Sequence, residues 1–518
     1  MEAPISPKSE HINPWIIAIA VMLSTFMEVL DTTVVNVSLP HIAGSLSASV
    51  DEATWALTSY LVANAVILPI TGWLASVLGR KRLLMMAVSG FTVASFLCGL
   101  APNLFMLIMF RILQGACGGA LQPISQAVLL ESFPAESRGK AMAFWGLGIV
   151  VAPMLGPVLG GWLTDSYSWR WVFYINVPVG IASLVMTEIF IFDPSYIRRM
   201  SRRIDFWGIG LLTIGVTSLQ IVLDKGQEED WFSSHWIATL AVLSIVALTA
   251  LVVYELYVGH PVLDLQVFRL RTYSAGVYLM AIMGVVLYGS LVMLPIMLQT
   301  LLGYTALQAG VAMFPRGLGS FIAMPIVGTI MTRFDPRKLL GGGIIACATS
   351  LLFLGSLNLN LGFLNIFWPQ FLQGVSLAFL FVPLTTVTMN PISREGMGNA
   401  TSIFNLMRNL GGSVGIAAVT TLVARNEQIN TNALGANIAL GNPQVQKSLE
   451  MLRGLFLSRG ADAATADRRA YAAIFAMVQR QAAMLAFNHT YWLLAGLFLL
   501  MLPLIALMRK PSHATSNH

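Results

Sequence analysis

Fourteen apolar runs, each close to the length that crosses a lipid bilayer, constrain this chain more than any other feature of its sequence. A membrane-spanning helix needs about 20 predominantly apolar residues. Of the 518 residues, 56% are hydrophobic and 10% are charged, whereas soluble domains carry about 25% charged residues. The sequence therefore predicts an all-α polytopic membrane protein. The runs lie near residues 15–39, 53–77, 83–101, 104–129, 141–163, 171–192, 205–223, 235–257, 274–300, 307–331, 339–357, 363–389, 399–424 and 488–508.

Basic residues are distributed unequally between the two sides of the predicted membrane. With the amino terminus inside, eighteen Lys and Arg residues fall in cytoplasmic segments and two, Arg170 and Lys225, fall in short external loops. Because cytoplasmic loops retain Lys and Arg, both termini are predicted to be cytoplasmic, and the net charge of +6 does not require a nucleic-acid partner. The eighteen are Lys8, Arg80, Lys81, Arg82, Arg138, Lys140, Arg198, Arg199, Arg202, Arg203, Arg269, Arg271, Arg333, Arg337, Lys338, Arg394, Arg509 and Lys510.

An internal repeat divides the chain into two halves of six spans. Phe110–Gly115 recurs as Pro369–Gly374, and Glu136–Ala141 recurs as Glu395–Ala400, both at an offset of 259 residues. The offset relates spans 1–6 to spans 9–14 and leaves spans 7 and 8 as an inserted pair, a 6+2+6 arrangement. The predicted divisions are a cytoplasmic tail (1–14), an N-terminal six-helix bundle (15–193), a basic linker with the inserted spans (194–260), spans 9–13 of the C-terminal bundle (261–425), an external loop (426–487), span 14 (488–510) and a second tail (511–518).

The segment 426–487 does not have the composition of a membrane span. It contains Glu427, Glu450, Asp462 and Asp467, and its apolar residues follow a partly helical spacing. This pattern predicts an external loop with one or two amphipathic helices. Two interpretations remain open: a solvated loop on the membrane surface, or a docking surface for a partner protein.

The run at 141–163 carries more glycine and proline than a water-exposed helix tolerates. In lipid the helix persists, small residues four apart let a neighbouring helix approach closely, and the prolines bend it. One interpretation is therefore a tightly packed, kinked membrane helix with no further role. The residues concerned are Gly148, Ala152, Pro153, Gly156, Pro157, Gly160 and Gly161.

Three charged side chains inside the apolar runs are candidates for proton coupling, because charges in a bilayer are costly and usually functional. Glu28 and Asp31 lie three residues apart on the first span and share a helix face. Two close carboxylates in a low dielectric do not both ionise easily, so one is expected to hold an exchangeable proton. Arg111 is expected to hold the deprotonated state. In the alternative interpretation, Asp31 and Arg111 form a purely structural pair.

Several motifs together resemble one family of transporters. Ala152–Gly161 resembles the Gly-Pro-x-x-Gly-Gly antiporter signature of proton-coupled exporters, Leu30–Pro40 resembles their first-span signature, and Leu107–Gly115 resembles their fourth-span signature. The chain thus resembles the fourteen-helix drug:proton antiporters of the major facilitator superfamily, EmrB/QacA type. The segments that are similar to the EmrB branch in particular are Asp224–Ser234, Pro369–Gly374 and Pro383–Thr386.

The resemblance implies the major facilitator fold, in which two six-helix halves rock around a central cavity. It implies a bacterial inner-membrane exporter of amphipathic drugs in exchange for protons, working with a periplasmic membrane fusion adaptor and an outer-membrane channel as a tripartite pump. The segment 426–487 is then periplasmic and a candidate contact for the adaptor. Two alternatives remain: an exporter of one solute, such as a siderophore, fatty acid or metabolite, and, more distantly, a membrane-embedded enzyme.

The residue types that support enzyme or metal chemistry are sparse. Cys98, Cys117 and Cys347 lie in apolar runs and the seven histidines are scattered, so neither a metal site nor a cofactor is predicted. No G-x-x-x-x-G-K-[ST] nucleotide loop occurs. The expected driving force is therefore an ion gradient. The resemblance implies protons, and sodium is the alternative ion, because carboxylates serve either.

The loop between the second and third spans departs from the superfamily pattern at one position. Ser76 stands where many members have an aspartate whose charge helps to close the cytoplasmic side. We therefore expect a weaker latch, or one that uses other partners around Arg333, Asp335 and Arg337. The residues of this gating loop are Gly72, Gly79, Arg80 and Lys81.

A cavity for chemically varied compounds needs apolar and aromatic walls with few polar groups. Arg316 and Arg408 are charges in spans of the second half, and either is expected to bind an anionic substrate group or to pair with the first span. A packing or snorkelling role is the alternative. The cavity candidates are Gln114, Met142, Phe144, Trp145, Arg316, Gln373, Phe379, Phe404, Asn405, Met407 and Arg408.

Overall fold

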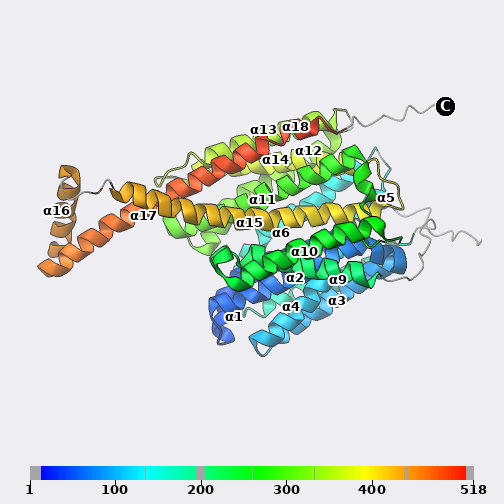
Figure 1. Ribbon diagram of the computed structural model, residues 1–518, viewed down its shortest axis with the longest axis horizontal. Coiled ribbons are helices and arrows are strands. Elements are labelled where there is room, and N and C mark those ends of the chain that lie inside the picture. The colour runs from blue at the N-terminus through cyan, green and yellow to red at the C-terminus, as the bar shows by residue number, and fades with distance from the viewer. Residues whose placement is uncertain are drawn as a thin grey trace, which may run out of the picture.

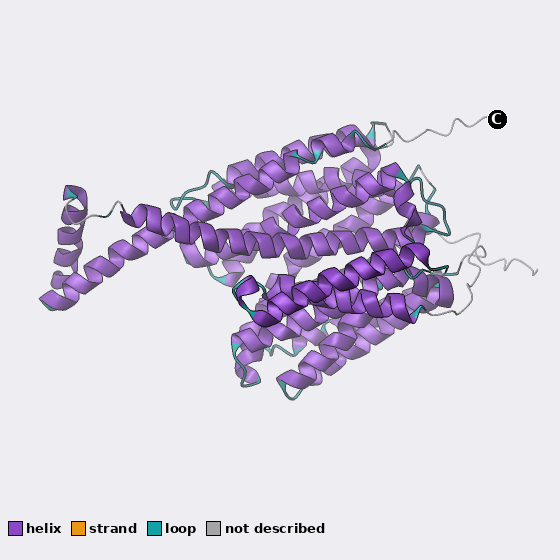
Figure 2. Cartoon of the chain, in the orientation of Figure 1, coloured by secondary structure: helices purple, strands orange, loops and turns teal. Residues whose placement is uncertain are grey.

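The computed structural model describes residues 13–134, 136–193, 205–259, 261–331, 333–436, 438 and 442–508, and every regular element within these ranges is a helix (Figure 2). Fourteen helical segments are long and apolar enough to cross a membrane. This confirms the predicted all-α polytopic fold with fourteen spans. Most of the predicted amino-terminal tail, most of the basic linker and the carboxyl-terminal tail lie outside the described residues.

The first half contains six spans, two of which are each built from two helices. The fourth span is interrupted by a turn at Gly119 and Ala120, between α4 and α5. Gly79 ends the second helix and begins the third with a φ of +87°, a conformation that glycine adopts without strain. The helices are α1 (Pro14–Ser45), α2 (Val50–Leu78), α3 (Arg80–Leu100), α4 (Leu104–Gly118), α5 (Leu121–Ser132), α6 (Arg138–Ser166), α7 (Trp171–Tyr174) and α8 (Asn176–Phe190).

The second half is larger because two of its helices continue beyond the bundle. Its helices are α11 (Arg271–Leu302), α12 (Ala306–Ile330), α13 (Pro336–Leu354), α14 (Phe363–Met389), α15 (Met397–Ala436), α16 (Pro443–Ser458), α17 (Ala463–Leu499) and α18 (Leu502–Ile505). Between the halves lie α9 (Phe206–Lys225), η1 (Trp231–Ser233), α10 (His235–Tyr257) and η2 (Leu265–Arg269).

Helix packing is repeated in the two halves. In the first half α1 packs on α6 and α8, and α2 packs on α4; in the second, α11 packs on α15 and α17, and α12 packs on α14. The 259-residue offset relates α1 to α11, α2 to α12, α4 to α14 and α6 to α15. The helix α17 takes the place of α8 at a larger separation, because the segment 426–487 precedes its bundle part. The halves contact each other mainly through α6 with α12 and α2 with α15, so the space between them is bounded by equivalent helices.

The inserted helix α9 bridges the two halves beside this space. It packs on α10, and it contacts both α2 and α15 (Figure 1). On the α2 side, Lys225 Nζ donates to Thr54 Oγ1 at 2.6 Å. On the α15 side, Gln220 Nε2 donates to Ser413 Oγ at 2.9 Å. The inserted pair therefore closes one side of the bundle.

An extension projects from one end of the bundle. The helices α15 and α17 have 40 and 37 residues, and their distal parts run past the other helices, where α16 packs on α17 (Figure 1). An ion pair of 2.8 Å between Arg453 and Asp467 joins α16 to α17. The segment 426–487 is thus built from the end of α15, α16 and the first part of α17.

Candidate functional site

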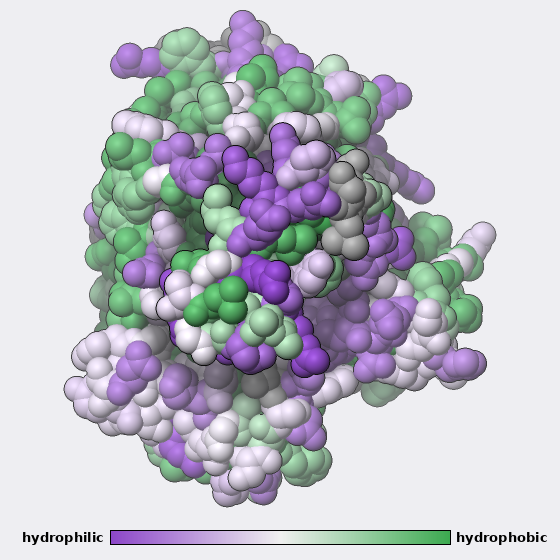
Figure 3. Space-filling model, turned by 90° about the vertical axis from the view of Figure 1, so that its left-hand side faces the viewer, coloured by the Kyte–Doolittle hydropathy of each residue, from purple (hydrophilic) through white to green (hydrophobic). Residues whose placement is uncertain are grey.

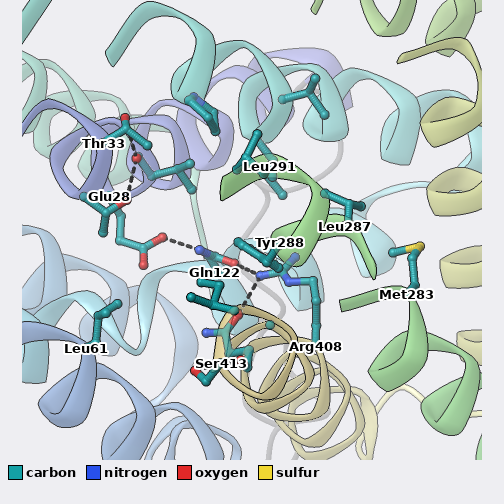
Figure 4. A pocket seen from close by; sticks show the side chains of 18 of the residues that line it. Glu28, Thr33, Leu61, Gln122, Met283, Leu287, Tyr288, Leu291, Arg408 and Ser413 are labelled. Carbon is teal, nitrogen blue, oxygen red and sulfur yellow. Dashed lines mark hydrogen bonds between the residues drawn. The ribbon is translucent and has the colours of Figure 1, made fainter. Parts of the chain in front are cut away.

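A central cavity of about 240 Å³ lies between the two halves. Its walls are mostly apolar and come from α1, α2, α5, α6, α9, α11, α12, α14 and α15. Large apolar walls with a few placed polar groups are typical of small-molecule sites. The charged and amide side chains in the lining are Glu28, Asn64, Gln122, Gln220, Arg316, Arg408 and Asn409. Figure 4 labels three of them, Glu28, Gln122 and Arg408.

Glu28 is joined to the other half of the molecule through Gln122. Its carboxylate accepts hydrogen bonds from Asn64 Nδ2 at 3.1 Å and from Gln122 Nε2. The other end of the Gln122 amide, Oε1, accepts from Arg408 Nη2 (Figure 4). Glu28 is 4% exposed and Arg408 5% exposed. A single side chain on α5 thus connects a buried carboxylate on α1 with a buried guanidinium on α15.

Asp31 has a different set of partners within the first half. Arg111 Nη1 donates to Asp31 Oδ2 at 2.6 Å, and both side chains are fully buried. Asp31 Oδ1 accepts from Gln114 Nε2 at 2.9 Å and from Asn176 Nδ2 at 2.7 Å. The Arg111 guanidinium also stacks on the Tyr60 ring, 4.1 Å from its centroid. Asp31 thus accepts three side-chain hydrogen bonds, while Arg111 Nη2 has no hydrogen-bond partner among the described residues. Neither Asp31 nor Arg111 lines the central cavity, although Tyr60 does.

The two candidate proton-coupling carboxylates are therefore in separate environments. Glu28 faces the cavity, whereas Asp31 bonds side chains of α4 and α8. Arg111 bonds Asp31, and Glu28 has Arg408 beyond Gln122 as its nearest linked cation. The geometry of Asp31 and Arg111 matches the alternative interpretation, a structural ion pair. Of the two carboxylates, Glu28 is the one that lines the cavity and is the better candidate for the exchangeable proton.

The end of the bundle that carries the turn between α2 and α3 is closed. A Cβ atom on Gly72 would lie 2.7 Å from Asn399 Cα, so α2 and α15 touch there. Thr401 Oγ1 donates to the Pro123 carbonyl at 3.1 Å. Asn405 Nδ2 donates to Gln126 Oε1 at 2.5 Å. These bonds lie between the cavity and the closed end.

The basic residues of the gating loop bind acidic side chains elsewhere in the fold, since position 76 is a serine and offers no carboxylate. Arg80 forms a buried ion pair with Glu131 and donates from Nη2 to the Arg394 carbonyl of the second half at 3.2 Å. Lys81 pairs with Glu188 at 3.3 Å, and its backbone N–H donates to Asp193. Among the described residues, the one hydrogen bond found for Ser76 Oγ runs to the Trp73 carbonyl of its own helix.

The second-half residues that we expected to take part in the latch in place of the missing aspartate, Arg333, Asp335 and Arg337, form bonds within their own half. Asp335 caps α13 and pairs with Arg337 at 3.3 Å, and Arg337 also donates to the Met508 carbonyl at 3.0 Å. Arg80 therefore uses Glu131 on α5. Arg333 has a backbone hydrogen bond to Ile330, and no ion pair of its side chain is found among the described residues.

A sequence model of the Major Facilitator Superfamily matches residues 21–416. The chain belongs to this superfamily. It is 38% identical over 497 residues to the Multidrug export protein EmrB of Escherichia coli (strain K12), across 96% of this chain and 95% of that protein. It is 36% identical over 500 residues to the Fatty acid resistance protein FarB of Neisseria gonorrhoeae, across 96% of each chain.

The solved structure of the proton:xylose symporter XylE has the same fold as this chain, with a TM-score of 0.62, 14% identity and 96% of each chain covered. The superfamily model and the similarity to EmrB confirm the predicted family, and the protein is a multi-pass membrane transporter. The roles of individual residues stay predictions.

The antiporter-motif residues of this facilitator mostly lie at helix contacts. A Cβ atom on Gly148 would lie 2.8 Å from Met22 Cγ, and one on Gly160 would lie 2.8 Å from the Val34 carbonyl oxygen; Gly156 contacts Thr33 even more closely. These three glycines let α6 approach α1, as the small-residue spacing predicts. Pro153 lines the cavity and Pro157 contacts Gly310, whereas Gly161 faces open space.

Two of the eleven cavity candidates, Arg316 and Arg408, line the central cavity of this facilitator. Gln373 lines a smaller cavity behind it. Trp145 lies one layer further out, stacked on the lining residue Phe381 and donating to Thr25. Gln114 is held by Asp31 and Arg111, and Asn405 by Gln126. The candidates that pack among helices outside the cavity lining are Met142, Phe144, Phe379, Phe404 and Met407.

Sequence reasoning overlooked the amides that hold the charged groups. Gln122 connects Glu28 to Arg408, Asn64 bonds Glu28, and Asn176 bonds Asp31. Each is a polar side chain inside an apolar run, a signal for a buried hydrogen-bond partner in a membrane. Tyr288 on α11 also lines the cavity and was not distinguishable from packing aromatics by sequence (Figure 4).

Proposed function

We propose that this chain is a bacterial inner-membrane secondary transporter that exports amphipathic compounds in exchange for protons. The observation that carries the proposal is the connection of Glu28, in the cavity, to Arg408 of the opposite half through Gln122. The apolar cavity supports amphipathic substrates. The similarity to EmrB, whose name describes multidrug export, supports the same substrate class.

The proposed mechanism uses the charge of Glu28 to couple the proton to the movement of the halves. When Glu28 is ionised, the Gln122 amide is oriented by the carboxylate at one end and by Arg408 at the other. A proton on Glu28 removes the negative charge and weakens this orientation. The halves are then free to rearrange around the cavity, which is alternating access. The proton gradient drives the cycle and no bound cofactor takes part.

Proton flux in proteoliposomes of the purified protein tests this function. With an imposed pH gradient, and with the leak of protein-free liposomes subtracted for each compound, several unrelated amphipathic dyes are expected to dissipate the gradient, and Glu28→Gln to abolish that effect. Glu450→Gln, on the exposed face of α16, serves as the matched control. Flux that persists in Glu28→Gln, or that follows a sodium gradient alone, contradicts the proposal.

A second candidate function is the export of one physiological solute. The observation that favours it is the 36% identity to FarB, whose name describes fatty acid resistance. Competition distinguishes the two functions in the same proteoliposomes. If only fatty acids among the tested compounds dissipate the gradient, the specific exporter is the better description; if unrelated compounds compete, multidrug export is.

The extension formed by distal α15, α16 and α17 is the proposed contact for a periplasmic adaptor of the membrane fusion type, as part of a tripartite pump with an outer-membrane channel. Exposed apolar residues along it, Ile429, Met451, Tyr471 and Phe475, support a protein contact. Figure 3 shows this end, where hydrophilic side chains gather over the middle and hydrophobic ones lie along the flanks. Such a contact requires this end to be periplasmic and both termini to be cytoplasmic.

Co-purification tests the adaptor contact. Replacing residues 437–462 by a short Gly-Ser linker removes α16 while leaving the fourteen spans in place. Loss of the adaptor from the purified complex is the expected result, with retained proton flux as the control for folding. Unchanged co-purification places the contact elsewhere.

A further inference from the structure

The second half of the molecule repeats the hydrogen-bond network around Asp31 without its charges. Gln373 Nε2 donates to Ser290 Oγ at 3.2 Å, and Gln370 Nε2 donates to Gln373 Oε1 at 3.4 Å. The same two bonds in the first half run from Gln114 to Asp31 and from Arg111 to Gln114. At the 259-residue offset the equivalent positions are Asp31 and Ser290, Arg111 and Gln370, and Gln114 and Gln373.

Arg316 places a cation beside this neutral network. Its side chain is 6% exposed and, with Ser290 and Gln373, lines a small cavity of about 10 Å³. It also lines the central cavity. The backbone of Arg316 is held by close packing, because its carbonyl contacts Gly374 of α14 where a side chain would clash. The guanidinium therefore stands at the boundary between the two cavities.

Within the described part of the chain, Arg316 forms no ion pair. Its Nη1 has no hydrogen-bond partner, as is also true of Arg111 Nη2 and Arg408 Nε, but those two arginines each bond a side chain that holds or leads to a carboxylate. Its titratable neighbours are the buried side chains of Cys347 and Tyr491, and the Tyr491 hydroxyl also lacks a partner. An uncompensated charge in an apolar interior is costly, and a bound counter-charge removes that cost. Arg408 differs, because Gln122 links it to Glu28.

We propose that Arg316 binds the anionic head of an amphipathic substrate, of the carboxylate class. The substrate carboxylate then pairs with Arg316 in the second half, as Asp31 pairs with Arg111 in the first. The apolar tail is expected to lie against Met283, Leu287 and Phe381, which line the same cavity. This inference rests on the proposed export of amphipathic compounds and names one substrate class for it.

Binding of two matched probes tests the inference without requiring transport. Radiolabelled dodecanoate and dodecanol have the same tail and differ in charge at pH 8, and each is measured against the protein in lipid nanodiscs, with empty nanodiscs subtracted. Hydrogen bonds to charged groups contribute about 1.5–3 kcal/mol, or roughly 10-fold to 150-fold in affinity. Arg316→Gln is therefore expected to lower the ratio of dodecanoate to dodecanol affinity at least about 10-fold.

Three further variants make the test decisive. Arg425→Gln removes an exposed arginine of α15 outside the cavity and is expected to leave the affinity ratio unchanged. Arg316→Lys keeps the charge and is expected to recover part of the ratio. Ser290→Asp supplies an internal carboxylate beside Arg316, as in the first half, and is expected to lower the ratio even if Arg316→Gln does not fold.

An unchanged ratio in Arg316→Gln with a normal unfolding midpoint overturns the inference. If that variant does not fold, an unchanged ratio in folded Ser290→Asp overturns it. Failure of the proposed proton exchange is a separate result, because it appears as absent flux in proteoliposomes and leaves the binding ratio measurable.

Discussion

The two halves of this transporter share a helix packing and differ in where they keep charge. In the first half, Asp31 and Arg111 form a fully buried pair, supported by Gln114 and Asn176. In the second half, the equivalent network contains only a hydroxyl and two amides, and the nearby cation, Arg316, has no acidic partner among the described residues. One fold thus accommodates an internal ion pair in one half and, in the other, a buried cation for which we propose a substrate carboxylate as the partner.

Breaking the buried pair of the first half is expected to have the largest effect. Asp31→Asn leaves Arg111 buried without its counter-charge, and removal of one partner of a buried pair costs about 3–5 kcal/mol. The midpoint of thermal unfolding in detergent should fall strongly, and less folded protein should be recovered. A midpoint equal to that of wild type would show that Asp31 does not hold α1 against α4.

The double variant Asp31→Ser with Arg111→Gln gives the first half the neutral residues of the second. Because no unpaired charge remains, it is expected to be more stable than Asp31→Asn or Arg111→Gln alone. The unfolding midpoints of the three variants, measured together, check this order. If the double variant is the least stable, the two networks are not interchangeable and the comparison fails.

A smaller difference is expected between Gln114→Leu and Gln373→Leu. Gln114 bonds two charged groups, whereas Gln373 bonds a hydroxyl and an amide. Hydrogen bonds to charged groups contribute about 1.5–3 kcal/mol and neutral ones about 0.5–1.5 kcal/mol. Gln114→Leu should therefore lower the unfolding midpoint more than Gln373→Leu does, and equal shifts would contradict the interpretation that only the first-half network around Gln114 contains charged groups.

The smallest structural effect is expected from Gln122→Glu, which retains the size of the side chain that links the halves. A second carboxylate beside Glu28 still pairs with Arg408 but no longer donates to Glu28. The unfolding midpoint is expected to change little, while the substrate-induced proton flux changes its dependence on pH. An identical pH profile in both proteins would show that Gln122 does not transmit the state of Glu28.

The fold followed from the sequence because the bilayer imposes simple rules on it. Spans must be about 20 apolar residues long and must satisfy their own backbone hydrogen bonds, so the apolar runs marked the helices. The repeat between Phe110–Gly115 and Pro369–Gly374 indicated two related halves. The glycines of α6 indicated a close helix contact, and α1 is the partner that Gly148, Gly156 and Gly160 contact.

The site could be predicted from the sequence only in part, because the spacing of residues along one helix does not identify the side chains that they contact on other helices. Residues three apart, such as Glu28 and Asp31, differ by about 60° around the helix axis. That rotation is enough to turn Glu28 toward the cavity and Asp31 toward α4 and α8. The carboxylate that pairs with Arg80, Glu131, lies fifty-one positions away in the chain and was found only from the packing of α5 against the loop.

By itself, the sequence determined the membrane class, the number of spans, the two-fold repeat and the family of this transporter, since these depend on composition and on motifs that are local in the chain. Only the tertiary structure decided which charges are neutralised internally and which face the cavity. The reason is physical: the cost of a buried charge depends on atoms that surround it in space, and those atoms come from helices distant in sequence.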